Sequence, residues 1–362
     1  MQSLISDLAR ASFLKSIALF STAPKMPGTK RDTLMNLTAE LLGALATQYQ
    51  IPSLSVFILG GKGSDTSSLH FTKDELSRSS RDTQMYMIGS ITKTVTAALT
   101  MRAIEKKLLT LDSLASQYLP SIKPFGDITV RNLLNHTSGL PDIFESSALK
   151  NTTGVAFDVD KSAILASLKE TPQVAAPNSA YFYSNANYLA LAAILEAVKH
   201  KSYTALVASM MDELEITDFA PVITEKEVNN SLGHLLISDK PVPLPIAGYR
   251  WLEGAGNLAA TSRSLGFFYQ ALFKGKVVSG ESLSLMAKEV KASSYGMGLQ
   301  IEKKPNRRLY HTGHVPGSTA IASWYREKEI VITVLANMDP ADVRMCSTIA
   351  YLLTVHFDRA DA

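Results

Sequence analysis

The chain has 362 residues, of which 46% are hydrophobic and 19% are charged, so it can bury a large core within one or two closely packed domains. Its 36 basic and 33 acidic residues leave a formal net charge of +3, which is too balanced for a nucleic-acid-binding surface. A single cysteine, Cys346, excludes an intramolecular disulfide framework and a thiolate metal site.

The N-terminal segment is where a targeting sequence would lie. Its longest apolar runs, such as 17–20, fall short of the roughly 7–15 apolar residues of a secretory signal. We therefore expect residues 1–36 to form an N-terminal arm, with a targeting segment as the alternative. A cytoplasmic protein is favoured, and an exported or periplasmic one is the alternative. No later run approaches the roughly 18 apolar residues of a transmembrane helix.

The predicted elements begin with a helix over about 33–49, which Pro52 ends. A strand over 53–59 and a hairpin turn at 60–63 follow. The middle of the chain is mostly helical in pattern, with a proline-rich loop at 241–245, and its clearest helical runs are 91–107 and 186–199. Strands are then predicted over 296–301, 318–325 and 329–336, and a closing helix over 341–357.

Strands at both ends of the chain and helices between them predict an α+β fold, or α/β in the broad sense. The expected architecture is an antiparallel sheet built from both chain ends and flanked by helices, with a mostly helical subdomain inserted. The sheet domain would comprise 37–90 and 262–362, and the helical subdomain 91–261. We expect the active site between the two.

The motif Ser-x-x-Lys occurs three times, at Ser12, Ser90 and Ser147, so by itself it is weak evidence. Only Ser90 follows a glycine and begins a long helical run, where free backbone N–H groups and the positive end of the helix dipole face the serine oxygen. The spacing also places the Lys93 amine on the same helix face as the Ser90 hydroxyl. For the motif alone, the alternative is a serine N-cap followed by a solvated lysine.

A lysine with its ordinary pKa of about 10.4 is protonated at neutral pH, so a catalytic lysine needs burial or positive neighbours, and a second group to relay the proton. Tyr183-Ser184-Asn185 offers a phenol and an amide directly before a helical run. His311-Thr312-Gly313 lies beside a predicted strand, where the glycine would let a substrate approach the backbone closely. Alone, each tripeptide is more typical of a capped turn or a strand end.

Together and in this order, the three motifs resemble those of the penicillin-recognising serine hydrolases, which comprise class C β-lactamases, DD-peptidases and family VIII-type esterase relatives. The resemblance covers roughly 38–338 and implies a β-lactamase/DD-peptidase-like fold. Further segments resemble the family in the same order at 109–112, 118–120, 128–140, 253–258 and 295–299.

The resemblance implies that Ser90 is the nucleophile that forms an acyl-enzyme and that Lys93 and Tyr183 share the general acid and base work. Which of them takes the first proton stays open. The oxyanion hole would be the backbone N–H of Ser90 and that of the residue after His-Thr-Gly. The implied substrate-binding and oxyanion-hole positions are Asn185, His311, Thr312, Gly313 and His314.

Departures from the family bear on the substrate. His311 replaces the lysine common in β-lactamases, and histidine there is more familiar among DD-peptidases and D-amino-acid-specific peptidases. Some DD-peptidase relatives hold the substrate carboxylate with an arginine directly after the Gly-x-Gly-Leu segment, where this chain has Gln300. Unless Arg307, Arg308 or another base reaches the site, esters or neutral amides fit at least as well as a carboxypeptidase substrate.

The predicted function is therefore a DD-peptidase-like serine hydrolase acting on a D-amino-acid peptide, an amide or a small ester. A carboxylesterase, an acyltransferase or a weak β-lactamase of the same fold is the alternative, and a non-catalytic binding protein is the remaining one. No His-Glu-x-x-His pair or similar cluster suggests zinc, and no cofactor is expected. We interpret His136 as a satisfied buried histidine in a structural turn, and Asp112 as a helix cap.

Overall fold

The fold is described from a computed structural model. The predicted N-terminal arm lies outside the described residues, as do most of the first predicted helix and the turn after Gly60. The structure describes residues 42–44, 46–47, 50–60, 66–72, 75–77, 84–150, 159–222, 233–237, 240–244, 249–304, 307–339 and 345–360.

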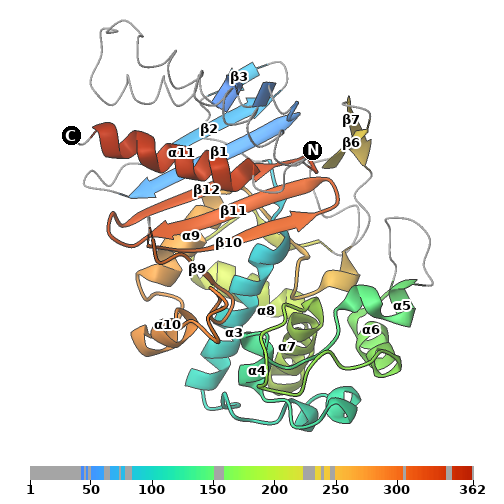
Figure 1. The fold of residues 1–362 in the computed structure, drawn as a ribbon. Helices are drawn as coiled ribbons and strands as arrows, with labels where there is room; N and C mark the ends of the chain where they lie inside the picture. Colours follow the sequence, from blue (N-terminus) through green and yellow to red (C-terminus); the bar gives the residue numbers. More distant parts are fainter. Residues whose placement is uncertain are drawn as a thin grey trace, which may run out of the picture.

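Strands from both ends of the chain form one seven-stranded antiparallel sheet, as predicted (Figure 1). The order is β3-β2-β1-β12-β11-β10-β9, so that an early strand lies beside the last one, with Val56 opposite Val334. The strands are β1 Ser53–Gly60, β2 Thr66–Thr72, β3 Glu75–Ser77, β9 Gln300–Ile301, β10 Arg308–Val315, β11 Ser318–Tyr325 and β12 Ile330–Ala336.

Helices cover both faces of this sheet. Val56 and Ile58 of β1 belong to a core shared with α11 (Met345–Ala360), whereas Phe57 and Leu59 belong to the larger core that includes α9 (Ser262–Phe273). Successive side chains of a strand point to opposite faces. Both faces of β1 are therefore buried, which explains its continuous apolar run.

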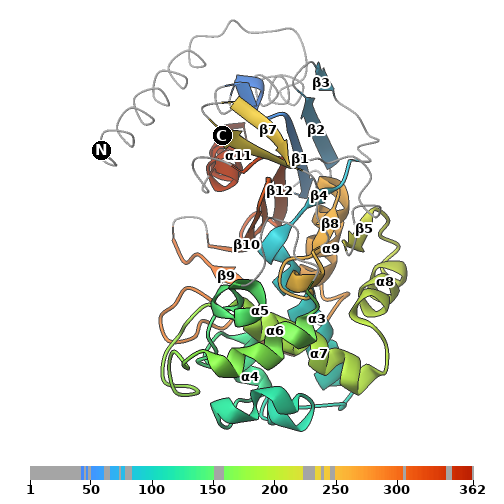
Figure 2. The same cartoon turned by 90° about the vertical axis from the view of Figure 1, so that its right-hand side faces the viewer.

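The other helices lie below the sheet in both ribbon views (Figures 1 and 2). Residues 92–101 of α3 are buried throughout, so α3 is the central helix of this part. The helices are α3 Thr92–Glu105, α4 Val130–Leu134, α5 Ser147–Lys150, α6 Lys161–Ser167, α7 Asn185–Lys199, α8 Tyr203–Glu213 and α10 Gly280–Met286. Short 3₁₀ turns are η1 Gly89–Ile91, η2 Ala115–Gln117, η3 Pro120–Phe125, η4 Ile143–Glu145, η5 Leu168–Glu170 and η7 Arg250–Leu252.

The predicted strand over 296–301 is a strand only at its last two residues. Gly298 has φ +72°, and a Cβ built there would lie 2.8 Å from the carbonyl oxygen of Lys93. This stretch therefore packs against the backbone of α3 and cannot extend along β10. Gly298 serves that close approach.

The middle of the chain contains small strands that were not predicted. The proline-rich stretch expected to be a loop includes β7, which among the described strands pairs only with β6, in a two-stranded sheet. Prolines are tolerated on such edge strands because their missing N–H faces away from the partner. These additional strands are β4 Tyr86–Met87, β5 Phe219–Pro221, β6 Gly233–Ile237, β7 Lys240–Leu244 and β8 Leu258–Ala260.

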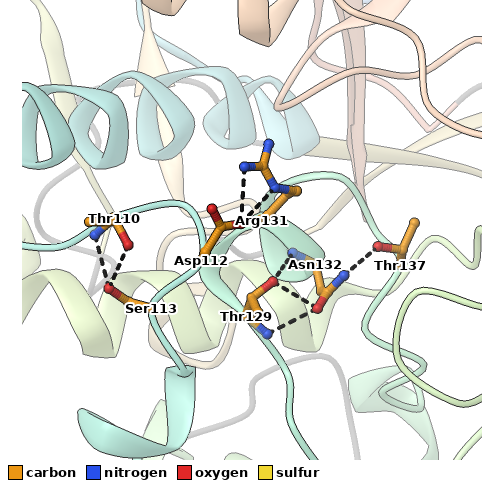
Figure 3. A network of polar contacts seen from close by, with 7 residues as sticks. All are labelled: Thr110, Asp112, Ser113, Thr129, Arg131, Asn132 and Thr137. Carbon is orange, nitrogen blue, oxygen red and sulfur yellow. Dashed lines mark hydrogen bonds and ion pairs between the residues drawn. The ribbon is translucent and has the colours of Figure 1, made fainter.

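The segment that enters α4 is held by polar contacts (Figure 3). Thr129 and Asn132 form a capping box at the start of α4, and Asn132 Nδ2 donates to Thr137 Oγ1 over 2.9 Å. Asp112 Oδ1 accepts hydrogen bonds from Nε and Nη2 of Arg131 at 3.1 and 3.0 Å. The interpretation of Asp112 as a helix cap is wrong, because the turn that follows it, η2, has Leu114 at its N-cap position without a side-chain cap hydrogen bond. Asp112 pairs instead with a side chain of α4.

No helix within the described ranges is both long and apolar enough to cross a membrane. The domain boundaries given above stay a prediction.

Candidate active site

Ser90 lies in the single turn η1, between β4 and the buried helix α3. The cap positions of η1 and α3 are Ile88 and Ile91, and neither makes a side-chain cap hydrogen bond. Ser90 is half-buried, while the Lys93 side chain is fully buried and its Nζ lies 2.9 Å from Ser90 Oγ. The alternative of a serine N-cap with a solvated lysine is therefore excluded.

The Lys93 amine has three hydrogen-bond partners. Besides Ser90 Oγ, it donates to Asn185 Oδ1 and to the carbonyl oxygen of Ala255, each over 2.8 Å. It also lies over the ring of Tyr183, 4.9 Å from the ring centroid. An ammonium group can donate to all three acceptors, whereas a neutral amine keeps two donors and turns its lone pair to the third group, Ser90.

Burial changes the protonation of this amine. The pKa of Lys93 is lowered from 10.5 to about 7 because the apolar surroundings disfavour the ammonium, while the nearby Asp142 carboxylate opposes part of this effect. A large fraction of Lys93 is therefore neutral near pH 7 and can accept a proton.

Tyr183 and Asn185 flank Ser184, the residue directly before α7. Ser184 is its N-cap: the hydroxyl accepts from the N–H of Ala186 over 3.2 Å and donates to the carbonyl of Pro141 over 3.0 Å. Burial raises the pKa of Tyr183 well above its ordinary value, although a hydrogen bond with Ser90 acts in the opposite direction. Tyr183 is thus a protonated phenol hydrogen-bonded to Ser90.

His136 is buried beneath the Tyr-Ser-Asn segment, as expected. Its Nδ1 accepts hydrogen bonds from the Ser184 N–H at 3.2 Å and from Asn187 Nδ2 at 2.9 Å, and its carbonyl accepts from the Phe182 N–H at 2.9 Å. Since Nδ1 is an acceptor, the ring proton is on Nε2, which has no hydrogen-bond partner among the described residues. We expected a histidine with both ring nitrogens hydrogen-bonded, but only Nδ1 of His136 has partners among the described residues. Its ring centroid lies 4.3 Å from that of Tyr183.

The His311 side chain points to the interior. It is 1% exposed, its Nδ1 donates to the carbonyl of Thr312 at 2.6 Å, and its Nε2 accepts from the Tyr295 hydroxyl at 3.0 Å. Burial and the charge of Lys93 lower its pKa to about 3, so His311 is neutral. Thr312 is half-buried and donates through its N–H and its hydroxyl to Gln300 Oε1, at 3.3 and 3.4 Å.

Two glycines bring β10 against η1. A Cβ on Gly313 would lie 1.8 Å from the carbonyl oxygen of Ile88, and a Cβ on Gly89 would lie 2.6 Å from the backbone nitrogen of His314. In a two-residue hairpin the closing pair exchanges backbone hydrogen bonds. That pair is Val315 and Ser318, so the N–H of His314 points away from β11. The geometry therefore allows this N–H to form an oxyanion hole together with the N–H of Ser90.

The His314 side chain is exposed and has a partner of its own. Its Nε2 lies 2.6 Å from Asp339 Oδ1. Within the part of the chain that the structure describes, no group of three or more His, Cys, Asp or Glu side chains could hold a metal ion.

Three residues that contact this set were not identified from the sequence. Asp142 accepts from the Asn185 N–H at 2.8 Å and from its amide nitrogen at 3.1 and 3.4 Å. Its signal in the sequence was its place two residues after the segment 128–140 that resembles the family, and the structure makes it the N-cap of η4. Ala255 acts through its carbonyl oxygen and Tyr295 through its contact with His311. Both lie in segments that resemble the family, but these contacts are not readable from the sequence.

A buried ion pair supports the loop that carries Ala255. Lys161 Nζ lies 2.6 Å from Glu253 Oε2 and 2.8 Å from Glu196 Oε2, and Glu253 precedes Ala255 by two residues. Through Lys161, this pair and the Lys161–Glu196 pair connect the loop to α6 and α7.

Comparison with known families supports the resemblance noted in the sequence. The family model described as Beta-lactamase matches residues 38–355, which extends beyond the 38–338 expected from the motifs. A Bacillus subtilis (strain 168) protein named as a penicillin-binding protein, PbpX, is 27% identical over 255 residues, covering 70% of this chain and 62% of that protein. The chain thus spans about six-tenths of the length of that curated relative.

Solved structures show the same fold. The D-amino acid amidase from Ochrobactrum anthropi SV3, in complex with L-phenylalanine amide, has a TM-score of 0.78 at 19% identity and covers 91% of this chain and 100% of its own. The D-stereospecific amidohydrolase from a Streptomyces species has a TM-score of 0.73 at 22% identity, covering 86% and 96%. The octameric penicillin-binding protein homologue from Pyrococcus abyssi has a TM-score of 0.74 at 23% identity, covering 89% and 77%.

Proposed function

The chain belongs to the Beta-lactamase family, and on that premise we propose that it is a serine hydrolase in which Ser90 carries the acyl group between two chemical steps. The observation that carries the proposal is the buried amine of Lys93, whose pKa is about 7, at 2.9 Å from Ser90 Oγ. A serine hydroxyl needs such a base to become a nucleophile.

In the first step, neutral Lys93 accepts the proton of the Ser90 hydroxyl while Oγ forms a bond to the substrate's carbonyl carbon. The negative charge that develops on the carbonyl oxygen is stabilised by the N–H groups of Ser90 and His314. Burial raises the pKa of Tyr183, so Tyr183 keeps its proton until the bond between the carbonyl carbon and the leaving group breaks. It then donates that proton to the leaving group and regains one from the Lys93 ammonium. Lys93, and not Tyr183, is therefore the first base.

In the second step, water replaces the leaving group. Neutral Lys93 takes a proton from the water as its oxygen bonds to the acyl carbon. The bond between that carbon and Ser90 Oγ then breaks, and the Lys93 ammonium returns the proton to Oγ. Both steps use the same base and the same oxyanion hole.

The charges near the site support a substrate whose leaving group carries no carboxylate. Arg307 Nη1 is bound to Glu327 over 2.8 Å, and Arg308 pairs with Glu302. These two arginines, which were candidates to hold a substrate carboxylate, serve other partners. Gln300, which bonds to Thr312, offers an uncharged amide instead. We therefore propose an amide or ester of a D-amino acid as the substrate, in line with the names of the two amide-hydrolysing structures.

Intact-mass spectrometry tests the acyl-enzyme. The wild type would be incubated separately with a fluorescent penicillin and a short-chain nitrophenyl ester, and D- and L-phenylalanine amide would be assayed for turnover. We expect turnover of the D-amide or the ester, with any adduct mapping to Ser90. Product analysis with added alcohol or amine distinguishes hydrolysis from acyl transfer. An absence of turnover and adduct with every reagent would favour a non-catalytic binding protein.

The pH dependence of kcat/KM follows from Lys93. Its pKa of about 7 means that the amine is protonated and inactive as a base at lower pH. We expect kcat/KM to fall about tenfold per pH unit below pH 7 and to reach a plateau above it. Steady-state kinetics with a neutral ester between pH 5 and 9 measure this, and a profile that is flat through pH 7 contradicts the role of Lys93.

Gly313→Ala tests the oxyanion hole. The new Cβ would collide with the backbone of Ile88, so β10 must shift away from η1 and take the His314 N–H from its position. Loss of one such donor typically lowers kcat by about 100- to 1,000-fold. Gly280→Ala is the matched control, since nothing lies within 4 Å of a Cβ at that position. Equal kcat in the two variants, both folded by circular dichroism, would contradict the assignment of His314.

A further inference from the structure

Asp142 lies at the centre of the hydrogen bonds around Asn185. The half-buried carboxylate accepts from the Asn185 N–H through Oδ2 at 2.8 Å. It also accepts from Asn185 Nδ2, through Oδ2 at 3.1 Å and Oδ1 at 3.4 Å, and from the Phe144 N–H at 3.3 Å. Both hydrogen-bond donors of Asn185, its backbone N–H and its side-chain NH₂ group, therefore bind Asp142.

These contacts fix which way the Asn185 amide faces. A carboxylate can only accept hydrogen bonds, so the NH₂ end of the amide must face Asp142. The oxygen end, Oδ1, is then left for the Lys93 amine at 2.8 Å. If the amide turned over, its NH₂ group would face the donating amine of Lys93 and its oxygen would face a carboxylate, and both contacts would be repulsive.

We propose that Asp142 is a positioning residue, which orients the Asn185 amide so that its oxygen holds the Lys93 amine against Ser90. This proposal rests on the proposed function for its kinetic consequence. The effect of the Asp142 carboxylate on the Lys93 amine can be tested without turnover.

The charge of Asp142 adds a second, measurable effect on Lys93. The ionisable groups that face the amine are Asp142 before η4, His136 after α4, Tyr183 and Tyr188 at α7, and His311 on β10. Asp142 is the only carboxylate among them, and it raises the pKa of Lys93 against the effect of burial. Its removal should therefore make Lys93 a weaker base.

Asp142→Asn is the test variant, because it keeps the size of the side chain and one acceptor for backbone N–H groups. The new NH₂ group can donate to Asn185 Oδ1, so the Asn185 amide is no longer held in one orientation. We expect kcat/KM at pH 8 to fall about 100-fold, the cost typical of a misplaced catalytic group. We also expect the pKa of Lys93, measured by NMR of ¹³Cε-labelled lysine with Lys93→Met for assignment, to fall below the wild-type value.

Asp160→Asn is the matched control. Asp160 caps α6 through the N–H groups of Ser162 and Ala163, at 2.7 and 3.0 Å, as Asp142 caps η4. It should leave the pKa of Lys93 and kcat/KM as in the wild type, although both variants can lose some stability. An Asp142→Asn protein with wild-type kcat/KM and an unshifted Lys93 pKa overturns the proposal. If the wild type turns over no substrate, the proposed function fails, while the Lys93 pKa still tests whether Asp142 acts on that amine.

Discussion

The Ser90→Ala variant is expected to lose on the order of 10⁶-fold in kcat, as found when the nucleophile of a cooperating catalytic set is removed. The hydroxyl is the atom that bonds to the acyl carbon, and Lys93 and Tyr183 both act through it. Without Oγ no acyl-enzyme forms, so the mass adduct should disappear as well. The fold should persist, because the exchange removes a single half-buried oxygen atom.

Ser147→Ala is the matched control for this prediction. Ser147 begins the same Ser-x-x-Lys pattern at the start of α5, but its hydroxyl donates to the exposed side chain of Glu170. Its kcat should equal that of the wild type. Turnover in Ser90→Ala at a rate close to the wild type, after contaminating hydrolase is excluded by an independent preparation, would contradict Ser90 as the nucleophile.

Segments with a strong local pattern were predicted well from the sequence. The strand predicted over 318–325 is β11 with the same bounds, and the strand over 53–59 is β1 extended by Gly60. Both combine apolar residues with small ones and are buried at almost every position, so local pattern and tertiary burial agree. The helix over 186–199 is α7, which begins one residue earlier because Ser184 caps it.

The errors lie where tertiary contacts decide the conformation. The strand expected over 296–301 is interrupted by the packing of Gly298 on α3, and β7 forms although it contains two prolines. Neither outcome is encoded by local propensity. Both depend on which backbone lies beside the segment.

The residues of the candidate site also fall into those that the sequence motifs predict and those that only tertiary contacts reveal. The short motifs supplied Ser90, Lys93, Tyr183 and Asn185, and the structure brings all four into one network. The sequence could not supply the acceptors that complete this network, because a carboxylate such as Asp142 gives no sign of where it points. It also left open which group is the first base, since that depends on the burial of Lys93 and Tyr183.

Lys93→Met should lower kcat by about 10⁴-fold, the upper range for the loss of a general base. Its pH profile of kcat/KM should also lack the fall below pH 7 that we expect for the wild type. Methionine fills much of the same buried volume but cannot accept the Ser90 proton. Lys106→Met is the control, because Lys106 is exposed just beyond the end of α3. If kcat/KM of Lys93→Met still falls below pH 7, the group that titrates there is not Lys93.

The same variant should show what the buried amine costs in stability. The pKa of Lys93 is about 7 when folded and near 10.5 when unfolded, so below pH 7 the ammonium is present in both states and the folded state bears its full cost. At about 1.4 kcal/mol per pKa unit this cost is about 5 kcal/mol, and it is relieved as pH rises from 7 to 10.5. The free energy of unfolding of the wild type should therefore gain about 1.4 kcal/mol per pH unit relative to Lys93→Met across that range. Urea unfolding of both proteins at pH 6, 8 and 9.5 measures the difference, and a constant difference would mean that Lys93 keeps an ordinary pKa and cannot serve as the base.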